Sequence, residues 1–128
     1  MTGRRTILIV DDDPTVTRTF ARMLRLEDYD VHTALDVESA LQEVALVHPD
    51  AVLLDLRIPR QDGIVFLRRL RAQEAQRTPV AIITGDYSLD PSLCTELRDL
   101  EASIFFKPLW IDDLLRIAKQ LLKNTGTS

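Results

Sequence analysis

The chain has 128 residues, and 16 lysine and arginine residues against 20 aspartate and glutamate residues give it a formal net charge of −4. This length fits one ordinary domain, and 45% hydrophobic with 28% charged residues indicates a soluble globular protein instead of a disordered or fibrous one. One cysteine excludes an internal disulfide, and no apolar run reaches the roughly 18 residues of a membrane span. The acidic net charge argues against nucleic acid as a partner. We therefore expect a cytoplasmic domain without membrane or nucleic-acid partners.

Short apolar runs alternate with helical patterns along the whole chain. The first run, Thr6–Val10, is continuous and rich in β-branched residues, which is typical of a strand buried on both faces. Asp13 and Pro14 then predict a helix N-cap followed by proline at the first helical position. Further strands are predicted at Tyr29–Ala34, Ala51–Leu54, Val80–Thr84 and Ser103–Phe106.

Helical patterns follow each of these strands. Asp36 predicts the cap of the second helix, Pro59 and Gly63 mark the loop before the third, and Asp90 predicts the cap of the fourth. Four apolar residues at helical spacing mark the last helix: Leu114, Ala118, Leu121 and Leu122. The polar residues 124–128 are predicted to fray or to begin a linker. Five strands alternating with five helices predict a single α/β domain over residues 1–128, with a parallel sheet covered on both faces.

Polar or ionic side chains stand at the ends of four predicted strands. Asp11 and Asp12 follow the first strand, Asp55 follows the third, Thr84 closes the fourth, and Lys107 follows the fifth. Ligands of parallel α/β sheets bind at the carboxyl ends of the strands, near the point where the strand order reverses. The sequence therefore predicts one site at this edge of the sheet.

These residue types together suit phosphoryl transfer. Three neighbouring carboxylates repel one another unless a cation lies between them, and Mg²⁺ is commonly held by one or two carboxylates together with phosphate oxygens. Lys107 offers a compact positive charge for a phosphate or carboxylate oxygen, and Thr84 offers a hydroxyl donor. Asp55 would then be the nucleophile and would form an acyl phosphate.

Four motifs, in order along the chain, resemble those of response-regulator receiver domains, the CheY-like phospho-accepting modules of two-component signalling. Residues 7–14 resemble the first strand with its acidic pair, and residues 49–63 resemble the segment around the phosphorylated aspartate, here Asp55. Ile-Ile-Thr-Gly places the switch threonine at Thr84, and Phe-Phe-Lys-Pro-Leu places the lysine at Lys107. The resemblance covers essentially the whole chain.

The resemblance implies a flavodoxin-like sheet of strand order 2-1-3-4-5 and a cis Lys107–Pro108 peptide. It implies Mg²⁺, with Mn²⁺ as a substitute, held by Asp11, Asp12, Asp55 and the backbone carbonyl of Arg57. A sensor histidine kinase or histidine phosphotransfer protein would donate the phosphoryl group, and phosphorylation and dephosphorylation would be self-catalysed, so the domain would not be an enzyme. A face made of the fourth helix, fifth strand and fifth helix would bind a downstream protein, a fused output domain or a second copy of the chain.

The chain departs from the family pattern at Ile104, where receiver domains usually have phenylalanine or tyrosine. Without a gap, Phe105 faces the opposite side of the sheet, whereas a slip of one residue would bring it into place; we favour the ungapped alignment. We therefore expect coupling from Thr84 to the output face to be weakened or rerouted. The resemblance also places Arg57 and Asp86 at the mouth of the site, where they either slow dephosphorylation or are merely two solvated charges.

Two further features are interpreted as ordinary. Trp110 stands at the start of the last helix, where it is either an exposed anchor or a ring folded over the neighbouring loop, and we favour the folded ring. A group of arginines on or after the third helix is predicted to form a solvated basic face: Arg68, Arg69, Arg71 and Arg77.

Two other functions remain open. Residues 11–16 also fit the D-x-D-x-T-V pattern of haloacid-dehalogenase-type phosphatases, in which Asp11 would be the nucleophile. That assignment leaves Asp55 without a role. The other alternative is a pseudo-receiver that only binds partners, against which the complete set of acids, threonine and lysine argues.

Overall fold

The computed structural model describes residues 4–58, 61–73, 77–86 and 88–123. Pro59 and the predicted frayed tail, residues 124–128, lie outside the described residues. The elements of the described chain are β1 (Thr6–Val10), α1 (Pro14–Arg25), β2 (Asp30–Ala34), α2 (Val37–Val47), β3 (Ala51–Asp55), β4 (Arg57–Ile58), β5 (Gln61–Asp62), α3 (Gly63–Gln73), β6 (Val80–Thr84), α4 (Pro91–Asp99), β7 (Ala102–Phe106) and α5 (Ile111–Lys123).

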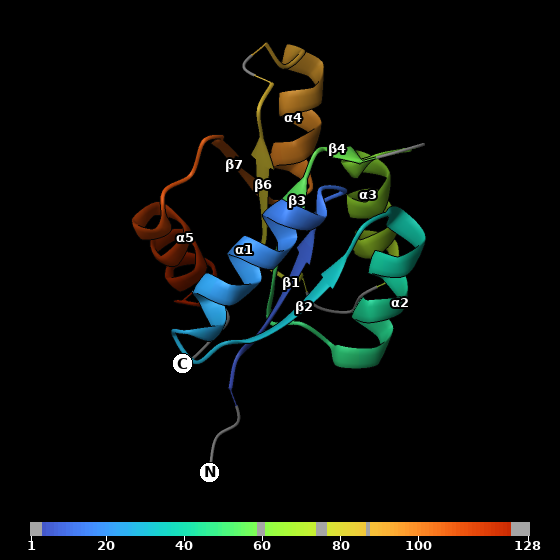
Figure 1. Cartoon of the computed structure of the whole chain (residues 1–128). Coiled ribbons are helices and arrows are strands. Elements are labelled where there is room, and N and C mark those ends of the chain that lie inside the picture. The colour runs from blue at the N-terminus through green and yellow to red at the C-terminus, as the bar shows by residue number, and fades with distance from the viewer. Residues whose placement is uncertain (1–3, 59–60, 74–76, 87, 124–128) are drawn as a thin grey trace.

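Five parallel strands form the main sheet in the order β2-β1-β3-β6-β7 (Figure 1). Counted along the chain without the two short strands, this is the predicted order 2-1-3-4-5. The short strands β4 and β5 pair antiparallel as a separate ribbon, in a segment that the sequence placed in a loop. Two-residue strands leave no hydrophobic period for a sequence pattern to detect.

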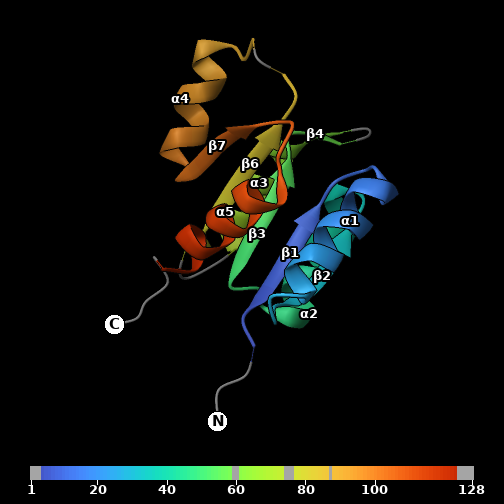
Figure 2. The ribbon, with the colours of Figure 1, turned by 60° about the vertical axis from the view of Figure 1, so that its left-hand side comes forward.

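Alternate residues of each strand face two separate hydrophobic cores. Leu8 and Val10 of β1 contact the core shared with α2, α3 and α4, whereas Ile7 and Ile9 contact the core shared with α1 and α5. Figures 1 and 2 show these two groups of helices on opposite sides of the sheet. Because strands buried on both faces need apolar side chains at every position, β1, β3 and β6 appear in the sequence as unbroken apolar runs. No helix in the described part of the chain is long and apolar enough to span a membrane.

The three predicted helix caps are confirmed. Asp13, Asp36 and Asp90 each accept a backbone N–H from the residue two or three positions further on, at 2.9, 2.8 and 2.9 Å respectively. These bonds satisfy N–H groups that have no partner inside the first helical turn. The start of α1, α2 and α4 is therefore determined locally, and so are the loops that carry the strand-end residues.

Gly63 lies in close contact with the end of β3. A Cβ atom at this position would lie 2.7 Å from the backbone oxygen of Asp55 and 3.0 Å from the Cα of Leu56. The Gly63 N–H also donates to the Leu56 carbonyl at 2.6 Å. The first residue of α3 is thus pressed against the strand that ends in Asp55, and only a residue without a side chain fits there.

We predict that Gly63→Ala lowers the free energy of unfolding by about 1–3 kcal/mol, because the added methyl group would clash with backbone atoms that are held in the sheet. Gly85→Ala is the matched control, since a Cβ there meets nothing within 4 Å, and we expect it to change stability by no more than about 0.5 kcal/mol. Urea denaturation followed by circular dichroism measures both. Equal stability of the two variants would contradict the close contact.

Candidate functional site

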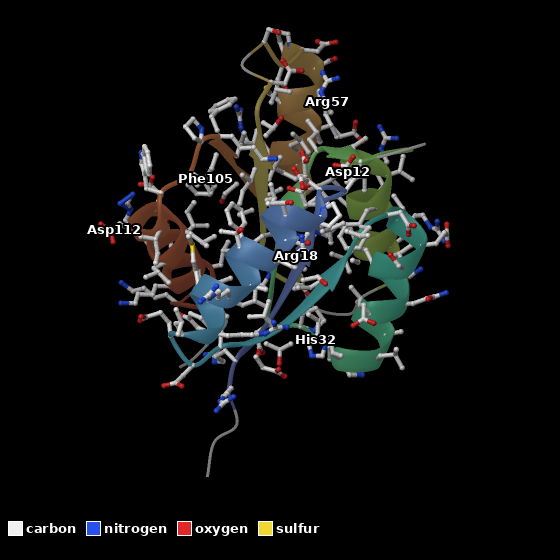
Figure 3. The ribbon with its side chains drawn as sticks, in the orientation of Figure 1. Asp12, Arg18, His32, Arg57, Phe105 and Asp112 are labelled. Carbon is white, nitrogen blue, oxygen red and sulfur yellow. The ribbon has the colours of Figure 1, made fainter. Side chains whose placement is uncertain are left out.

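The strand register brings the predicted site residues to one edge of the sheet. Val10 of β1 pairs with Leu54 of β3, so the residues that follow them, Asp11 and Asp55, are neighbours. Asp55 pairs with Ile83, the residue before Thr84. The Lys107 N–H donates to the Thr84 carbonyl at 2.8 Å, directly after the end of β7. Four strand ends therefore meet at the predicted place, and Figure 3 labels Asp12 and Arg57, which follow the ends of β1 and β3.

Three carboxylates gather around this edge. Asp11, Asp12 and Asp55 each offer one carboxylate oxygen, and these atoms lie within 4.8 Å of one another. Asp11 is 4% and Asp55 9% exposed, whereas Asp12 is open to solvent. The Lys107 ammonium group lies between the two buried acids, with Nζ 3.3 Å from Asp11 Oδ2 and 3.4 Å from Asp55 Oδ2. One cation thus faces three anions in a partly buried setting.

Burial and charge shift the pKa values of this group. Burial raises the pKa of Asp11 above its ordinary value of 3.8, although the Asp13 N–H and Lys107 both oppose that change. Burial alone would lower the pKa of Lys107, but the charges of Asp11 and Asp55 outweigh it and raise the net value. At neutral pH Lys107 is therefore firmly cationic, whereas burial makes the charged form of Asp11 less favourable than it would be in water.

The backbone amides around the site orient the acids further. The Asp13 N–H donates to Asp11 Oδ1 at 3.0 Å, and the Arg57 N–H donates to Asp55 Oδ1 at 3.0 Å. Each buried acid therefore has one oxygen bound to a backbone amide and the other near Lys107. This arrangement fixes both carboxylates before any ligand binds.

Thr84 is fully buried, and its hydroxyl oxygen accepts the Asp86 N–H at 3.1 Å. The Asp86 carboxylate in turn accepts a hydrogen bond from the Arg57 guanidinium. The pairing of Arg57 with Asp86 across the mouth of the site therefore exists, and the two are not separate solvated charges. This hydrogen bond and the charge of Arg57 help to lower the pKa of Asp86, to which the Ser88 N–H makes the largest contribution.

The ungapped alignment at Ile104 is confirmed. Ile104 pairs with Ile82 and packs against the core shared with α2, α3 and α4, whereas Phe105 packs against the core shared with α1 and α5. A parallel pairing fixes which face each residue of β7 takes, because a slip of one residue would turn every side chain over. The position that receiver domains usually fill with an aromatic residue is thus occupied by Ile104, while Phe106 pairs with Thr84 at the end of β7.

The arginines on or after α3 form an exposed basic face, as predicted, and they also pair with acids. Arg68, Arg69 and Arg77 have exposed side chains that pair with Glu96, Glu38 and Glu101, whereas the part-buried Arg71 donates to backbone carbonyls. The three acids are distant in sequence, so no spacing rule could have found these pairs.

The interpretation of Trp110 as a folded ring was wrong. Trp110 is 73% exposed, and its backbone N–H donates to Asp113 at the start of α5.

The donor set fits a hard divalent cation. Such ions bind carboxylate and carbonyl oxygens, and the cluster supplies three carboxylates at one edge of the sheet. A cation there would relieve the repulsion that Lys107 only partly offsets. Within the described residues, this is the group of acids or histidines close enough together to hold a metal ion.

Comparison with known proteins agrees with this site. The family model described as "Response regulator receiver domain" matches residues 7–119. The chain therefore belongs to the response-regulator receiver domain family, whose members are signalling proteins of two-component systems that bind Mg²⁺ at an acidic pocket.

Similar proteins include the regulatory protein AtoC of Escherichia coli, which is 36% identical over 96% of this chain and 26% of its own length. The chain thus spans about a quarter of that relative. The BeF3-activated N-terminal receiver domain of Klebsiella pneumoniae RstA is 30% identical, with a TM-score of 0.78 over 94% of this chain and all of that one. The chemotaxis response regulator CheY4 of Vibrio cholerae is 26% identical, with a TM-score of 0.83 over 93% and 99% of the two chains.

We predict that Asp11→Asn stabilises the metal-free protein at neutral pH by about 0.5–2 kcal/mol, the range usual for relieving unfavourable charge. Because the pKa of Asp11 is higher in the folded than in the unfolded protein, unfolding releases a proton between the two pKa values. The stability that protonated Asp11 contributes is therefore present below pH 3.8 and is lost as the pH rises through the pKa of the folded state. The advantage of the variant should accordingly shrink as the pH falls toward 3.8. Thermal unfolding in EDTA across this range measures it, and a variant less stable than wild type at pH 7 would contradict it.

Proposed function

We propose that this domain takes a phosphoryl group onto Asp55 from a sensor histidine kinase or histidine phosphotransfer protein. The observation that carries the proposal is the position of Lys107 between the carboxylates of Asp11 and Asp55, at the edge of the sheet where Asp12 completes the acidic cluster. A lysine and a cation-binding cluster beside one acid are what a transferring phosphoryl group needs to balance its charge.

Asp11, Asp12 and Asp55 would hold Mg²⁺, together with the backbone carbonyl of Arg57, and Mn²⁺ would serve as a substitute. When bound, the ion neutralises the charge that develops on the transferring phosphoryl oxygens. The cluster without a cation has a negative excess that Lys107 cannot balance alone, which supports this assignment.

The side chains of this chain would divide the remaining work. The Asp55 oxygen forms the new bond to phosphorus as the bond to the donor breaks, and the donor keeps that electron pair. Lys107 then contacts a phosphoryl oxygen in place of the Asp55 carboxylate, and the Thr84 hydroxyl turns to donate to another. We assign the attack to Asp55 and not to Asp11 because Asp55 stands at the position that matches the phosphorylated aspartate of the receiver family, to which this chain belongs.

We propose that phosphorylation changes the partners of the face made of α4, β7 and α5. Three large apolar side chains at the β7–α5 end of this face are at least two-fifths exposed: Phe106, Trp110 and Ile111. Such residues are frequent at the centre of protein interfaces. The partner would be a downstream protein, a fused output domain or a second copy of the chain, in the cytoplasm, with residues 1–128 acting as one receiver domain.

We predict that acetyl phosphate adds one phosphoryl group to the wild-type protein with Mg²⁺ and none in EDTA. Asp55→Asn should abolish the modification, because Asp55 stands at the position that receiver domains phosphorylate and no other acid would replace it as nucleophile. Intact-mass spectrometry followed by peptide mapping of the borohydride-reduced product identifies the residue.

The matched control is Asp99→Asn, which removes an acid at the end of α4, away from the cluster. Labelling that survives Asp55→Asn and disappears in Asp11→Asn would instead support the phosphatase alternative. A wild-type protein that is never labelled, although folded, would support the pseudo-receiver.

We predict that Arg57→Ala and Asp86→Ala each shorten the lifetime of the phosphorylated protein several-fold. Their side chains pair across the mouth of the site, so that either truncation opens a path for a hydrolytic water. Loss of phosphoprotein after removal of acetyl phosphate gives the rate. Arg69→Ala, which breaks an ion pair between α3 and α2, should leave the lifetime unchanged; lifetimes equal to wild type in all three variants would refute the role.

A further inference from the structure

Helix α4 buries fewer side chains than the other helices of the described chain. Among its nine residues Leu97 is the one that is fully buried, whereas α3 and α5 bury five each. Figures 1 and 2 show the upper part of α4 projecting beyond the end of the sheet. A helix that buries so little apolar surface depends on polar contacts for its position.

Arginines of α3 hold the C-terminal half of α4. Arg71 Nε donates to the Leu100 carbonyl at 2.8 Å, and Arg71 Nη1 donates to the Thr78 carbonyl, before β6, at 2.7 Å. Arg68 forms a two-pronged ion pair with Glu96, with Nη2 2.8 Å from Oε1. These contacts join the C-terminal end of α4 to α3 and to the segment before β6.

The N-terminal end of α4 is held through Asp86 instead. The Asp86 N–H donates to Thr84 Oγ1, and its carboxylate accepts from Arg57 on one oxygen. The other oxygen accepts both the N–H and the hydroxyl of Ser88, each at 3.0 Å. Ser88 leads directly to Asp90, the N-cap of α4, so Asp86 joins the site to the start of this helix.

A surface pocket of about 260 Å³ lies beside this junction. Its lining combines the arginine–aspartate pair with apolar side chains from the segment after β3, from α3, and from α4 and the residues before it: Leu56, Arg57, Ile64, Asp86, Leu89 and Leu93. Because no side chains fill this pocket, the less buried end of α4 has room to shift there.

We propose that Asp86 is a positioning residue that transmits phosphorylation of Asp55 to the N-terminal half of α4, in place of the aromatic ring that Ile104 replaces. The inference rests on the proposed function and adds to it the route by which the site is read out. The C-terminal half of α4 stays clamped by Arg71, so that the helix pivots about that end.

Two contacts of Asp86 lead to groups that a phosphoryl group would attract. Arg57 is two residues from Asp55, and its backbone N–H already binds Asp55 Oδ1; added negative charge on Asp55 competes with Asp86 for its guanidinium. The Thr84 hydroxyl, when it turns to donate to a phosphoryl oxygen, leaves the Asp86 N–H without its acceptor. Both changes loosen Asp86, and Ser88 and the start of α4 move with it.

The chain carries a native probe for this motion, because its single cysteine, Cys94, lies in the N-terminal half of α4. A trifluoromethyl tag on Cys94 reports on that half by fluorine NMR. Beryllium fluoride with Mg²⁺ serves as the phosphoryl mimic, and the fluorine signals of its bound form report occupancy of Asp55 independently. In the wild-type protein we expect occupancy and a shift of the tag signal together.

With beryllium fluoride adjusted so that occupancy of Asp55 equals that of the wild type, Asp86→Ala should lose at least half of the tag shift. Asp86→Asn, which keeps an acceptor for Ser88 but not the charge, should lose less. Arg69→Ala is the matched control, since it breaks an ion pair from α3 to α2, not to α4, and it should change neither signal.

Hydrogen exchange tests the pivot. On beryllium fluoride binding, amides of residues 92–94 should exchange several-fold faster or slower, while those of residues 97–100 stay unchanged. A full tag shift in Asp86→Ala at equal occupancy of Asp55 would overturn the inference and leave the proposed function intact. Equal changes in hydrogen exchange at both ends of α4 would have the same meaning. Absence of bound beryllium fluoride in wild type would overturn the proposed function itself and, with it, this readout.

Discussion

Repulsion among three carboxylates at one edge of a parallel sheet is the constraint on which the rest of this structure depends. Asp11 and Asp55 are placed side by side by the pairing of β1 with β3, and both are buried. Lys107, from the far edge strand, supplies the cation that makes this arrangement tolerable. The fold thus concentrates unbalanced negative charge where a divalent ion and a phosphoryl group can relieve it.

The same edge of the sheet also explains why α4 is tied to the site by polar contacts. Hydrophobic packing holds the other helices over the two cores, but α4 buries little apolar surface and is bound by hydrogen bonds and ion pairs. Polar contacts near charged groups respond to a change of charge, whereas apolar packing does not. The position of α4 accordingly depends on charge more than the position of a helix that is held by apolar packing.

Local sequence signals were accurate wherever one segment contains the whole physical cause. Asp13 and Asp90, each followed by proline, mark real helix starts, because a cap bonds to N–H groups only two or three residues away. The unbroken apolar run Thr6–Val10 indicates a strand buried on both faces, and it is one. The Trp110 ring and the short β4–β5 ribbon escaped prediction, since neither has a local pattern.

The sequence by itself determined the class of fold, the edge at which polar residues meet, and the five site residues at four strand ends, because the apolar period and the ends of the strands can be recognised along the chain. Only the tertiary structure decided which residues touch. Lys107 reaches Asp11 across 96 positions, and Arg57 reaches Asp86 across 29. Such pairs depend on strand register and helix packing, which arise from the whole core at once, so that no spacing within a segment encodes them.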